Sequence, residues 1–476
     1  MSTNTLIQAL QHPHLYDHPI KHFQVLETHG AWVLLTGNFA YKIKKPVDFE
    51  FLNYSTLAKR KFYCEEEVRL NQRLAAVLYL GVIPITGSPE NPVLNGSGPV
   101  IEYAIKMCEF PQSNLFSNLI QDGGVTPTLI DELAVITANF HTTLPTQNVD
   151  NIQAPVQQNF DQIRPMITEH TQLDRLETWA KTTYQKLKPV FEHRKQNGFV
   201  RECHGDLYLK NIILWDGHPL VFDCIEFNEE FRWTDTMADV GFLAMDLEDN
   251  GRADYAHRLI NQYMETSGDY NGLAVLRFYQ SYRAVVRAKI ALFQSNPAEY
   301  TRYINLAESY TKPIQPELII TYGVSGSGKS TRAKQLVEKL GVIQIRSDIE
   351  RKRLLGLTSD SKTNSAVNQG IYSEELNQKT YQRLRELAKN ILESGYSVIV
   401  DAAFLKQAQR ELFAQLAKTQ KISFKIIVCK VPETELKTRI LSRTTDPSEA
   451  RLDVLSMQLE AIEKLTNEES RAILND

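Results

Sequence analysis

The sequence is poor in several features that mark specialised classes of protein. It has five cysteines in 476 residues, and no two of them form a C-x-x-C pair. We therefore expect neither a disulfide framework nor a cysteine-based zinc site. No apolar run is long enough to cross a bilayer, and no basic stretch followed by an apolar one opens the chain. These absences predict a cytoplasmic protein without membrane contact.

Charge of one sign is not in excess either. Lys and Arg number 53 against 57 Asp and Glu, and the formal net charge is −4. Bulk positive charge holds most nucleic-acid-binding proteins to their partner, so a nucleic-acid partner is disfavoured, although a local basic channel is compatible with this balance. The sequence also lacks internal repeats and low-complexity tracts. Its length predicts two or three domains.

A change of pattern near residue 312 divides the chain. Before it, short alternating segments typical of an antiparallel sheet are followed by mainly helical sequence. The segment TKPIQPE, with two prolines, is typical of a linker, and after it strands alternate with helices as in a parallel sheet. We therefore predict one domain over 1–312, with lobes of about 1–108 and 109–312, and a second domain over 317–476.

The strongest single signal is GVSGSGKS, which follows the apolar segment LIITY and fits G-x-x-x-x-G-K-[ST]. Glycines in such a loop let backbone N–H groups converge on phosphate at the start of a helix. Lys329 is expected to reach the outer phosphates and Ser330 to bind Mg²⁺. The predicted nucleotide-binding residues are Gly323, Ser325, Gly326, Ser327, Gly328, Lys329, Ser330 and Thr331.

Further candidates follow the P-loop. Asp348 comes after the strand GVIQI and Asp401 ends SVIVD, and in parallel sheets chemistry gathers at the carboxyl ends of strands. Asp348 is expected to accept a proton from a substrate hydroxyl, or alternatively to cap a helix, and Asp401 to bind Mg²⁺, its water or substrate. Arg439 and Arg443 share a helix face, either to clamp a transferring phosphoryl group or as surface charges.

The C-terminal half resembles P-loop kinases of the polynucleotide kinase, zeta-toxin and chloramphenicol phosphotransferase type. GVSGSGKS, Asp348 after the second strand and an R-x-x-x-R lid carry the likeness, which covers about 317–476. The resemblance implies a P-loop NTPase fold, a parallel sheet flanked by helices. It also implies Asp348 as general base and Arg439 and Arg443 as lid arginines. It does not fix the substrate.

The N-terminal half contains HGDLYLKN, which has the spacing H-x-D-x-x-x-x-N of a kinase catalytic loop. Asp206 would accept or orient the hydroxyl proton and Asn211 would bind Mg²⁺. His204 would brace the loop, and Asp223, which ends the strand PLVFD, would be a second metal ligand. The alternative is a polar turn between two strands, but NIILW and PLVFD flank their own turn at Asp216.

Upstream residues fit the same pattern. The strand AYKIKKP offers Lys42 to pair with the phosphates, and Lys44 lies on the same face two residues later, so both stay candidates. Glu67 on the following helix would orient that lysine, with Glu66 as the weaker choice. An ordinary exposed charge is the alternative for each residue taken alone.

HGDLYLKN followed by FDCIEF resembles the aminoglycoside phosphotransferase and choline kinase group, over about 23–295. The resemblance implies a bilobal, protein-kinase-like fold. By it, Asp206 is the catalytic base, Asn211 and Asp223 are metal ligands, and 108–111 form the nucleotide hinge. The chain departs from the pattern in having no G-x-G-x-x-G loop. The two halves in this order, with KKPVDF, FLNYSTL and YRAVVRAK, also resemble a bacterial group of aminoglycoside phosphotransferase/ATP-binding fusions.

The fold class that follows is multidomain α+β and α/β. We expect an ATP- and Mg²⁺-dependent enzyme that phosphorylates hydroxyl groups of small molecules at two sites. Arg283 and Arg287, four apart on a predicted helix, would suit an acidic acceptor or form surface salt bridges. His141 is expected to be a core or capping histidine and not a ligand. Two rival functions stay open: a polynucleotide 5′-hydroxyl kinase in the second half, and a nucleotide-sensing regulator with one non-catalytic half.

Overall fold

The structure is a computed structural model that describes residues 2–49, 52–148, 152–358, 361, 374–442 and 452–474. It divides into two compact units. Unit 1 is Met1–Glu132, Phe140–Val156 and Glu192–Asp246, and unit 2 is Leu133–Asn139, Gln157–Phe191 and Leu247–Asp476. Residues 247–312 thus group with the segment that contains the P-loop. The domain boundary that the sequence suggests near 312 stays a prediction.

The strands are β1 (Gln24–Glu27), β2 (Ala31–Leu35), β3 (Phe39–Lys44), β4 (Asp48–Phe49), β5 (Leu52–Asn53), β6 (Tyr79–Gly87), β7 (Pro92–Leu94), β8 (Val100–Cys108), β9 (Val200–Glu202), β10 (Ile212–Trp215), β11 (His218–Val221), β12 (Trp233–Asp235), β13 (Glu317–Tyr322), β14 (Ile343–Arg346), β15 (Val398–Asp401) and β16 (Ser423–Val428). The α-helices are α1 (Ser2–Ala9), α2 (Leu57–Ala75), α3 (Phe116–Leu119), α4 (Pro127–Thr143), α5 (Gln153–Ile163), α6 (Thr171–Gln196), α7 (Glu229–Arg232), α8 (Thr236–Asp249), α9 (Ala253–Ser267), α10 (Leu273–Phe293), α11 (Pro297–Ser309), α12 (Lys329–Leu340), α13 (Ser347–Leu354), α14 (Glu374–Glu393), α15 (Gln407–Gln420), α16 (Glu433–Leu441), α17 (Leu452–Ala461) and α18 (Asn467–Arg471). Short 3₁₀ turns lie at Pro13–Leu15, Gln112–Asn114, Arg164–Met166, Leu209–Asn211 and Tyr270–Gly272.

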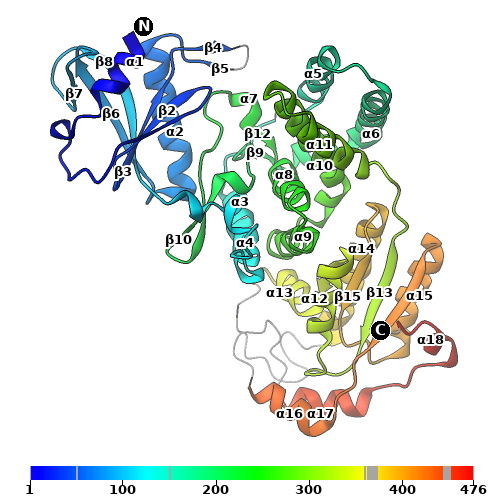
Figure 1. Cartoon of the computed structure of the whole chain (residues 1–476). Coiled ribbons are helices and arrows are strands. Elements are labelled where there is room, and N and C mark those ends of the chain that lie inside the picture. The colour runs from blue at the N-terminus through cyan, green and yellow to red at the C-terminus, as the bar shows by residue number, and fades with distance from the viewer. Residues whose placement is uncertain are drawn as a thin grey trace. The chain divides into compact units, whose positions relative to one another are not determined.

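Unit 1 is built on an antiparallel six-stranded sheet in the order β1-β2-β3-β8-β6-β7 (Figure 1). Its strands alternate between the two faces, so each face can carry its own apolar cluster. Helix α2 covers one face, where Cys64 and Ala75 pack with Ile105. Helix α1 covers the other, where Leu6 and Leu10 pack with Ile43. This sheet holds β3, the strand of the two candidate lysines.

A second part of unit 1 contains the catalytic-loop segment. Strands β10 and β11 pair as a hairpin, and its turn residues Asp216 and Gly217 have φ angles of 49° and 86°. Two consecutive left-handed residues match the right-handed twist of a two-residue hairpin. The segment HGDLYLKN therefore lies before this hairpin and not in its turn.

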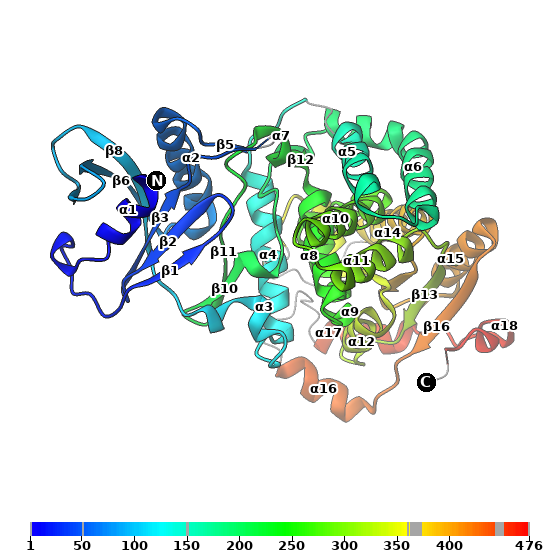
Figure 2. The ribbon, with the colours of Figure 1, turned by 45° about the horizontal axis from the view of Figure 1, so that its top comes forward.

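Unit 2 contains a sheet of four parallel strands in the order β14-β15-β13-β16. Its strands are short apolar runs, as expected when both faces are covered. Ile319, Ile399 and Ile427 pack with Ala333 and Val337 of α12. Helices α12, α14 and α15 lie beside the strands, and α9 lies against α12 (Figures 1 and 2). The parallel order brings the ends of β13, β14 and β15 to one edge of the sheet.

Within the described residues, no helix is both long enough and apolar enough to cross a membrane.

Candidate active sites

The P-loop connects β13 to α12 through a backbone that only glycine fits. Gly323 has a φ of 156°, and a Cβ added there would lie 2.4 Å from the carbonyl oxygen of Cys429. Gly328, with a φ of 91°, is the residue directly before the first turn of α12. Both glycines therefore answer a steric demand of the turn. The sequence anticipates this loop.

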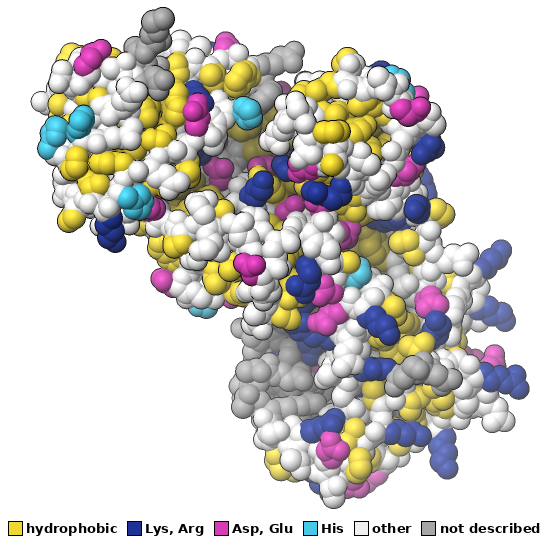
Figure 3. Space-filling view, viewed as in Figure 1, with side chains coloured by type: hydrophobic (Ala, Val, Ile, Leu, Met, Phe, Trp, Pro, Cys, Tyr) yellow, Lys and Arg dark blue, Asp and Glu magenta, His cyan; other side chains and the backbone are white. Residues whose placement is uncertain are grey.

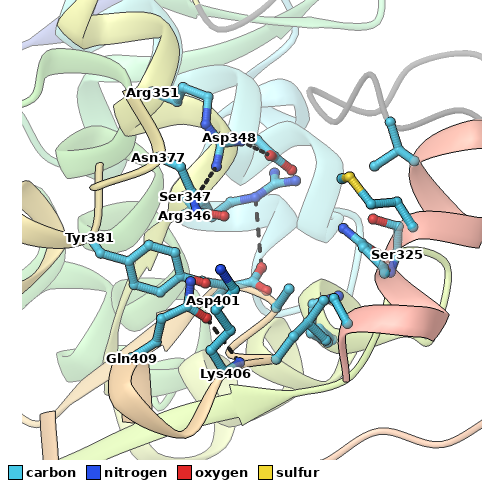
Figure 4. Close-up of a pocket in the computed structure, with 18 of the residues that line it drawn as sticks. Ser325, Arg346, Ser347, Asp348, Arg351, Asn377, Tyr381, Asp401, Lys406 and Gln409 are labelled. Atoms are coloured by element: carbon cyan, nitrogen blue, oxygen red, sulfur yellow. Dashed lines mark hydrogen bonds and ion pairs between the residues drawn. The ribbon is translucent and has the colours of Figure 1, made fainter. Parts of the chain in front are cut away.

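A cavity of about 310 Å³ opens beside the P-loop (Figure 4). Lys329 and Ser330 line it from the start of α12. Asp348 of α13 and Asp401 at the end of β15 also line it. Its other walls are Ser325, Arg346, Ser347, Arg351, Glu374, Asn377, Tyr381, Ala402, Ala403, Leu405, Lys406, Gln409, Val454, Met457, Gln458 and Ala461. The structure thus brings together the P-loop and the two strand-end aspartates predicted from the sequence.

Asp348 lies in the first turn of α13, not at the residue that precedes the helix. That position belongs to Arg346, whose side chain makes no capping hydrogen bond. Arg351, one turn later, donates from Nη1 to Asp348 Oδ1 at 3.1 Å and lies 3.5 Å from Asn377 Oδ1. A cationic partner favours the charged carboxylate, the form that can accept a proton. The sequence analysis did not single out Arg351.

Asp401 ends β15 at the wall of the same cavity and is nearly buried. Gln344 donates from Nε2 to Asp401 Oδ2 at 2.9 Å, and Arg346 Nε lies 3.9 Å from the same oxygen. Both partners come from β14, the neighbouring strand. Gln344 was also missed, although a glutamine within the apolar run GVIQI is a detectable signal, because a buried amide needs a partner.

The residues present fit a magnesium ion. Ser330 offers a hydroxyl and Asp401 a carboxylate to one cavity. Hard oxygen donors are those that Mg²⁺ prefers, usually with few protein ligands and several waters.

A second cavity, of about 490 Å³, lies on the outer side of the P-loop. It is lined by Gly326, Gly328, Lys329, Ser330, Thr331, Arg332, Gln335 and Arg439. Arg439, on α16, points Nη1 toward the carbonyl oxygen of Gly326 at 3.4 Å and pairs through Nη2 with Glu435. One of the two predicted lid arginines therefore reaches the P-loop. Arg443 lies outside the described residues.

In unit 1, Lys42 of β3 connects two carboxylates that are far apart in sequence. Its Nζ donates to Glu67 Oε1 at 2.7 Å and to Asp223 Oδ1 at 2.8 Å. Burial alone would lower the pKa of Lys42, but Asp223 and Glu67 raise it well above its usual range. Burial would likewise raise the pKa of Asp223, and the ammonium of Lys42 lowers it. Both groups are therefore held charged.

Lys44 reaches a different acid. Its Nζ donates to Glu67 Oε2 at 2.7 Å and also to Glu226, which accepts a further hydrogen bond from the Tyr54 hydroxyl. Lys44 and Glu67 are almost fully buried. Each lysine contacts Glu67, and the contact with Asp223 comes from Lys42. Glu66, the weaker candidate, contacts Arg69 instead.

The catalytic loop is held by Asp239 of α8. Its two carboxylate oxygens accept the backbone N–H groups of His204 at 2.8 Å and Gly205 at 3.0 Å. His141, buried as expected, lies 3.3 Å from the same carboxylate. With Cys203 these side chains form a compact group of possible metal donors. Because both oxygens of Asp239 already hold loop backbone, we interpret the group as support for the loop.

Inside the loop, side chains tie its two ends together. Asn211 donates from Nδ2 to the Asp206 carbonyl oxygen at 2.9 Å and to Asp206 Oδ2 at 3.1 Å. His204 accepts the Asp206 N–H at Nδ1 and donates from Nε2 to the Phe222 carbonyl, which links the loop to Asp223. Asp223 has a φ of 63°, a costly conformation for a non-glycine residue that is common at functional sites.

The oxygens of Asn211 and Asp223 suit a magnesium ion, as in the P-loop half.

Arg283 and Arg287 lie on α10. Arg283 is buried, and Arg287 is mostly covered and lies 3.6 Å from Glu299 of α11. Arg287 therefore takes part in a salt bridge, but neither arginine is the exposed surface charge of the second interpretation.

Two family models match separate segments of the chain. Residues 114–279 match the family model described as phosphotransferase enzyme family, and residues 318–465 match the model described as AAA domain. Curated relatives from Mycobacterium tuberculosis and Mycobacterium bovis, both described as uncharacterized proteins, are 29% identical over 446 residues, which is 90% of this chain and 88% of theirs.

Solved structures of low sequence identity are also similar. The GDP complex of aminoglycoside 2′-phosphotransferase-IIIa is 15% identical, with 65% of this chain and 97% of that chain covered and a TM-score of 0.41. A choline/ethanolamine kinase family protein from Mesorhizobium loti is 11% identical, with 71% and 100% covered and a TM-score of 0.43. A gluconokinase from Sinorhizobium meliloti is 22% identical, with 34% and 82% covered and a TM-score of 0.25.

The two family-model matches confirm that a protein-kinase-like segment precedes a P-loop segment, and they support phosphotransferase activity with use of ATP. This chain therefore joins a segment that matches the phosphotransferase enzyme family to one that matches the AAA domain.

Proposed function

We propose that this chain transfers the γ-phosphoryl group of ATP to hydroxyl groups of small-molecule acceptors, at one site in each half. The observation that carries the proposal is the convergence of Lys329, Asp348 and Asp401 on one cavity of about 310 Å³. These are a phosphate-binding cation, a carboxylate that can accept a proton and a carboxylate suited to a metal. Their convergence is what phosphoryl transfer needs, because its catalysis consists mainly of positioning and charge stabilisation.

In the P-loop site, Lys329 and the backbone N–H groups of 323–330 would hold the phosphates. Asp348 would orient the acceptor hydroxyl and take its proton as the oxygen–phosphorus bond to the acceptor forms and the bond to ADP breaks. Arg439 would neutralise charge on the transferring group. Ser330 and Asp401 would hold Mg²⁺, which supplies charge neutralisation on the phosphate oxygens when bound.

The lining of this cavity favours an acceptor that carries an anionic group. Arg346, Arg351 and Lys406 line it in addition to Lys329. Guanidinium groups bind carboxylate and phosphate by paired hydrogen bonds. A polyol or nucleoside with a carboxylate or phosphate would use these side chains while its hydroxyl faces Asp348.

In the kinase-like site, Lys42 would pair with the phosphates and Glu67 would hold it in place. Asp206 would take the hydroxyl proton, and Asn211 and Asp223 would hold Mg²⁺. The support for this assignment is the link between Lys42 and Asp223, which joins β3 to the second residue after β11.

The test measures ATP turnover by the full chain with a desalted small-molecule cell extract, in the wild type and in Asp206→Asn and Asp348→Asn. Each substitution should remove its own part of the stimulated turnover, by a factor of about 10²–10⁴. Asp453→Asn, an exposed aspartate of α17, serves as the matched control and should change nothing. Turnover that survives both substitutions would contradict the proposal.

A second arm offers 5′-hydroxyl oligonucleotides in place of the extract. On the face shown in Figure 3, Lys and Arg side chains are scattered among acidic ones, which supports a small acceptor over a long polyanion. Stimulation by oligonucleotides alone, lost in Asp348→Asn, would identify the second half as a polynucleotide 5′-hydroxyl kinase. Tight ATP binding in both halves without stimulated turnover would favour the regulator.

A further inference from the structure

Helix α9 precedes the linker but packs against the P-loop sheet within unit 2. It belongs to residues 114–279, which match the phosphotransferase enzyme family, and it lies against α12 and β14 (Figures 1 and 2). Asn261 of α9 accepts at Oδ1 the backbone N–H of Gln344 at 2.7 Å, and His257 Nδ1 donates to the Glu338 carbonyl at 3.1 Å. Since β14 is an edge strand, α9 satisfies a backbone group that the sheet leaves open.

The two surfaces approach closely at two glycines. Gly341, after α12, has a φ of 66°, and a Cβ there would lie 2.7 Å from His257 Nε2. Gly268, after α9, has a φ of 75°, and a Cβ there would lie 3.0 Å from Arg353 Nε. Arg353 of α13 also donates to the Glu265 carbonyl at 2.6 Å. These contacts hold the end of α9 firmly beside β14 and α13.

Glu265, near the end of α9, reaches the catalytic cavity through one arginine. Its Oε1 lies 3.9 Å from Arg346 Nη1, and Arg346 Nε lies 3.9 Å from Asp401 Oδ2. Arg346 lines the cavity beside Asp401, and its side chain points toward that carboxylate (Figure 4). Two carboxylates thus share one guanidinium at equal distance, and neither forms the shorter paired contact that a single arginine–carboxylate pair would adopt.

We propose that Glu265 is a positioning residue of the P-loop site: it draws Arg346 away from Asp401 and so keeps the Asp401 carboxylate available to a divalent cation. This inference rests on the proposed function, in which Asp401 holds the metal. Without the charge of Glu265, Arg346 would close onto Asp401, because the attraction between opposite charges grows as they approach in a partly buried site. A cation would then have to displace a guanidinium. Sequence outside residues 318–465 would thereby set the metal affinity of the P-loop site.

The test uses the full chain and Mn²⁺ binding in the presence of ADP, measured by isothermal titration calorimetry. The part of the Mn²⁺ binding signal that Asp401→Asn removes is assigned to the P-loop site. Glu265→Gln keeps the size and the packing of the side chain, and it should weaken that component by about tenfold, as expected when a partner of a metal ligand is lost. Its Mg²⁺ requirement for Asp348-dependent turnover should rise in parallel, with kcat at saturating Mg²⁺ little changed.

Two further variants separate positioning from structure. Glu265→Gln combined with Arg346→Gln removes the competing cation, so Mn²⁺ affinity should return toward the wild-type value. Glu338→Gln, which breaks the contact of α12 with Arg258 of α9 at the same interface, should leave the Mn²⁺ affinity unchanged. A wild-type affinity in Glu265→Gln, or no recovery in the double variant, overturns the inference while the proposed function stands. A wild type without an Asp401-dependent component overturns both.

Discussion

The two candidate sites hold their charged groups by different means. In the P-loop site, the charged groups are placed mainly by backbone conformation. Glycines shape the turn after β13 that leads to Lys329, Asp401 ends β15, and Asp348 lies in the first turn of α13. In the kinase-like site, the charged groups are held mainly by contacts between side chains. Lys42, Lys44 and Glu67 form a buried network with Asp223 and Glu226. Removing a functional side chain from the P-loop site should therefore cost activity with little loss of stability, whereas removing one from the buried network should cost both.

The largest expected effect tests the buried network. Lys44→Met removes the partner of Glu67 and Glu226 without removing Lys42, and it leaves carboxylates buried with less compensation. We expect the free energy of unfolding of unit 1 to fall by about 3–5 kcal/mol, the usual cost of breaking a buried ion pair from one side. Denaturant titration measures it, and the same experiment on Lys329→Met should show little change. Equal losses in both variants would contradict the comparison.

The next test concerns the backbone. Gly323→Ala places a methyl group against the Cys429 carbonyl, at a φ that L-residues rarely adopt. We expect the free energy of unfolding to fall by about 3 kcal/mol and the P-loop half to lose nucleotide binding. Gly395→Ala, at a φ of 86° with open space around it, is the matched control because it carries the conformational strain without the clash. ADP binding to the P-loop half, measured by calorimetry, distinguishes the two variants. It should be lost in Gly323→Ala and kept in Gly395→Ala.

The same difference explains what sequence could predict. The P-loop residues are contiguous in sequence and depend on local backbone geometry, and Asp348 and Asp401 follow from strand ends. The choice between Lys42 and Lys44 could not be made locally, because residues two apart on a strand share a face. What separates their contacts is Asp223, 181 residues further along the chain.

Other residues were missed for the same reason. Glu226 and Glu265 act across elements that the sequence does not place side by side, so no local pattern marks them. Gln344 is the exception, since an amide in a buried strand asks for a partner. The fold class, by contrast, follows from periodicity and motif order, and the family-model matches confirm it.

A smaller effect is expected where arginines gather around Glu202 in unit 1. Its carboxylate accepts hydrogen bonds from Arg69, Arg73 and Arg232. Burial alone would raise the pKa of Glu202, but these arginines lower it below its usual value of 4.5. Its stabilising effect is therefore complete above about pH 4.5 and is lost as the pH falls through the lowered pKa.

Glu202→Gln should lower the free energy of unfolding by about 2 kcal/mol at pH 7, which is the usual contribution of hydrogen bonds to a charged group. The difference from the wild type should shrink below pH 4.5 and vanish once the native carboxyl is protonated. Denaturant titrations between pH 7 and pH 3 measure it. Glu229→Gln, a mostly exposed acid near Arg232, is the control and should show little difference at any pH. A difference for Glu202→Gln that persists on acidification would assign its effect to packing instead of charge.

The smallest effect belongs to Arg439, and it sharpens the comparison from the P-loop side. Its side chain is partly exposed and pairs with Glu435 on its own helix, so its removal should leave the free energy of unfolding unchanged. If it neutralises charge on the transferring group, Arg439→Gln should still lower kcat of Asp348-dependent turnover by about tenfold, or about 1.4 kcal/mol of transition-state stabilisation. Lys437→Gln, which breaks a similar pair with Glu433 on the same helix, should lower neither. Because the two variants remove the same charge and the same kind of pair, a difference between them can come only from the reach of Arg439 to the loop at Gly326.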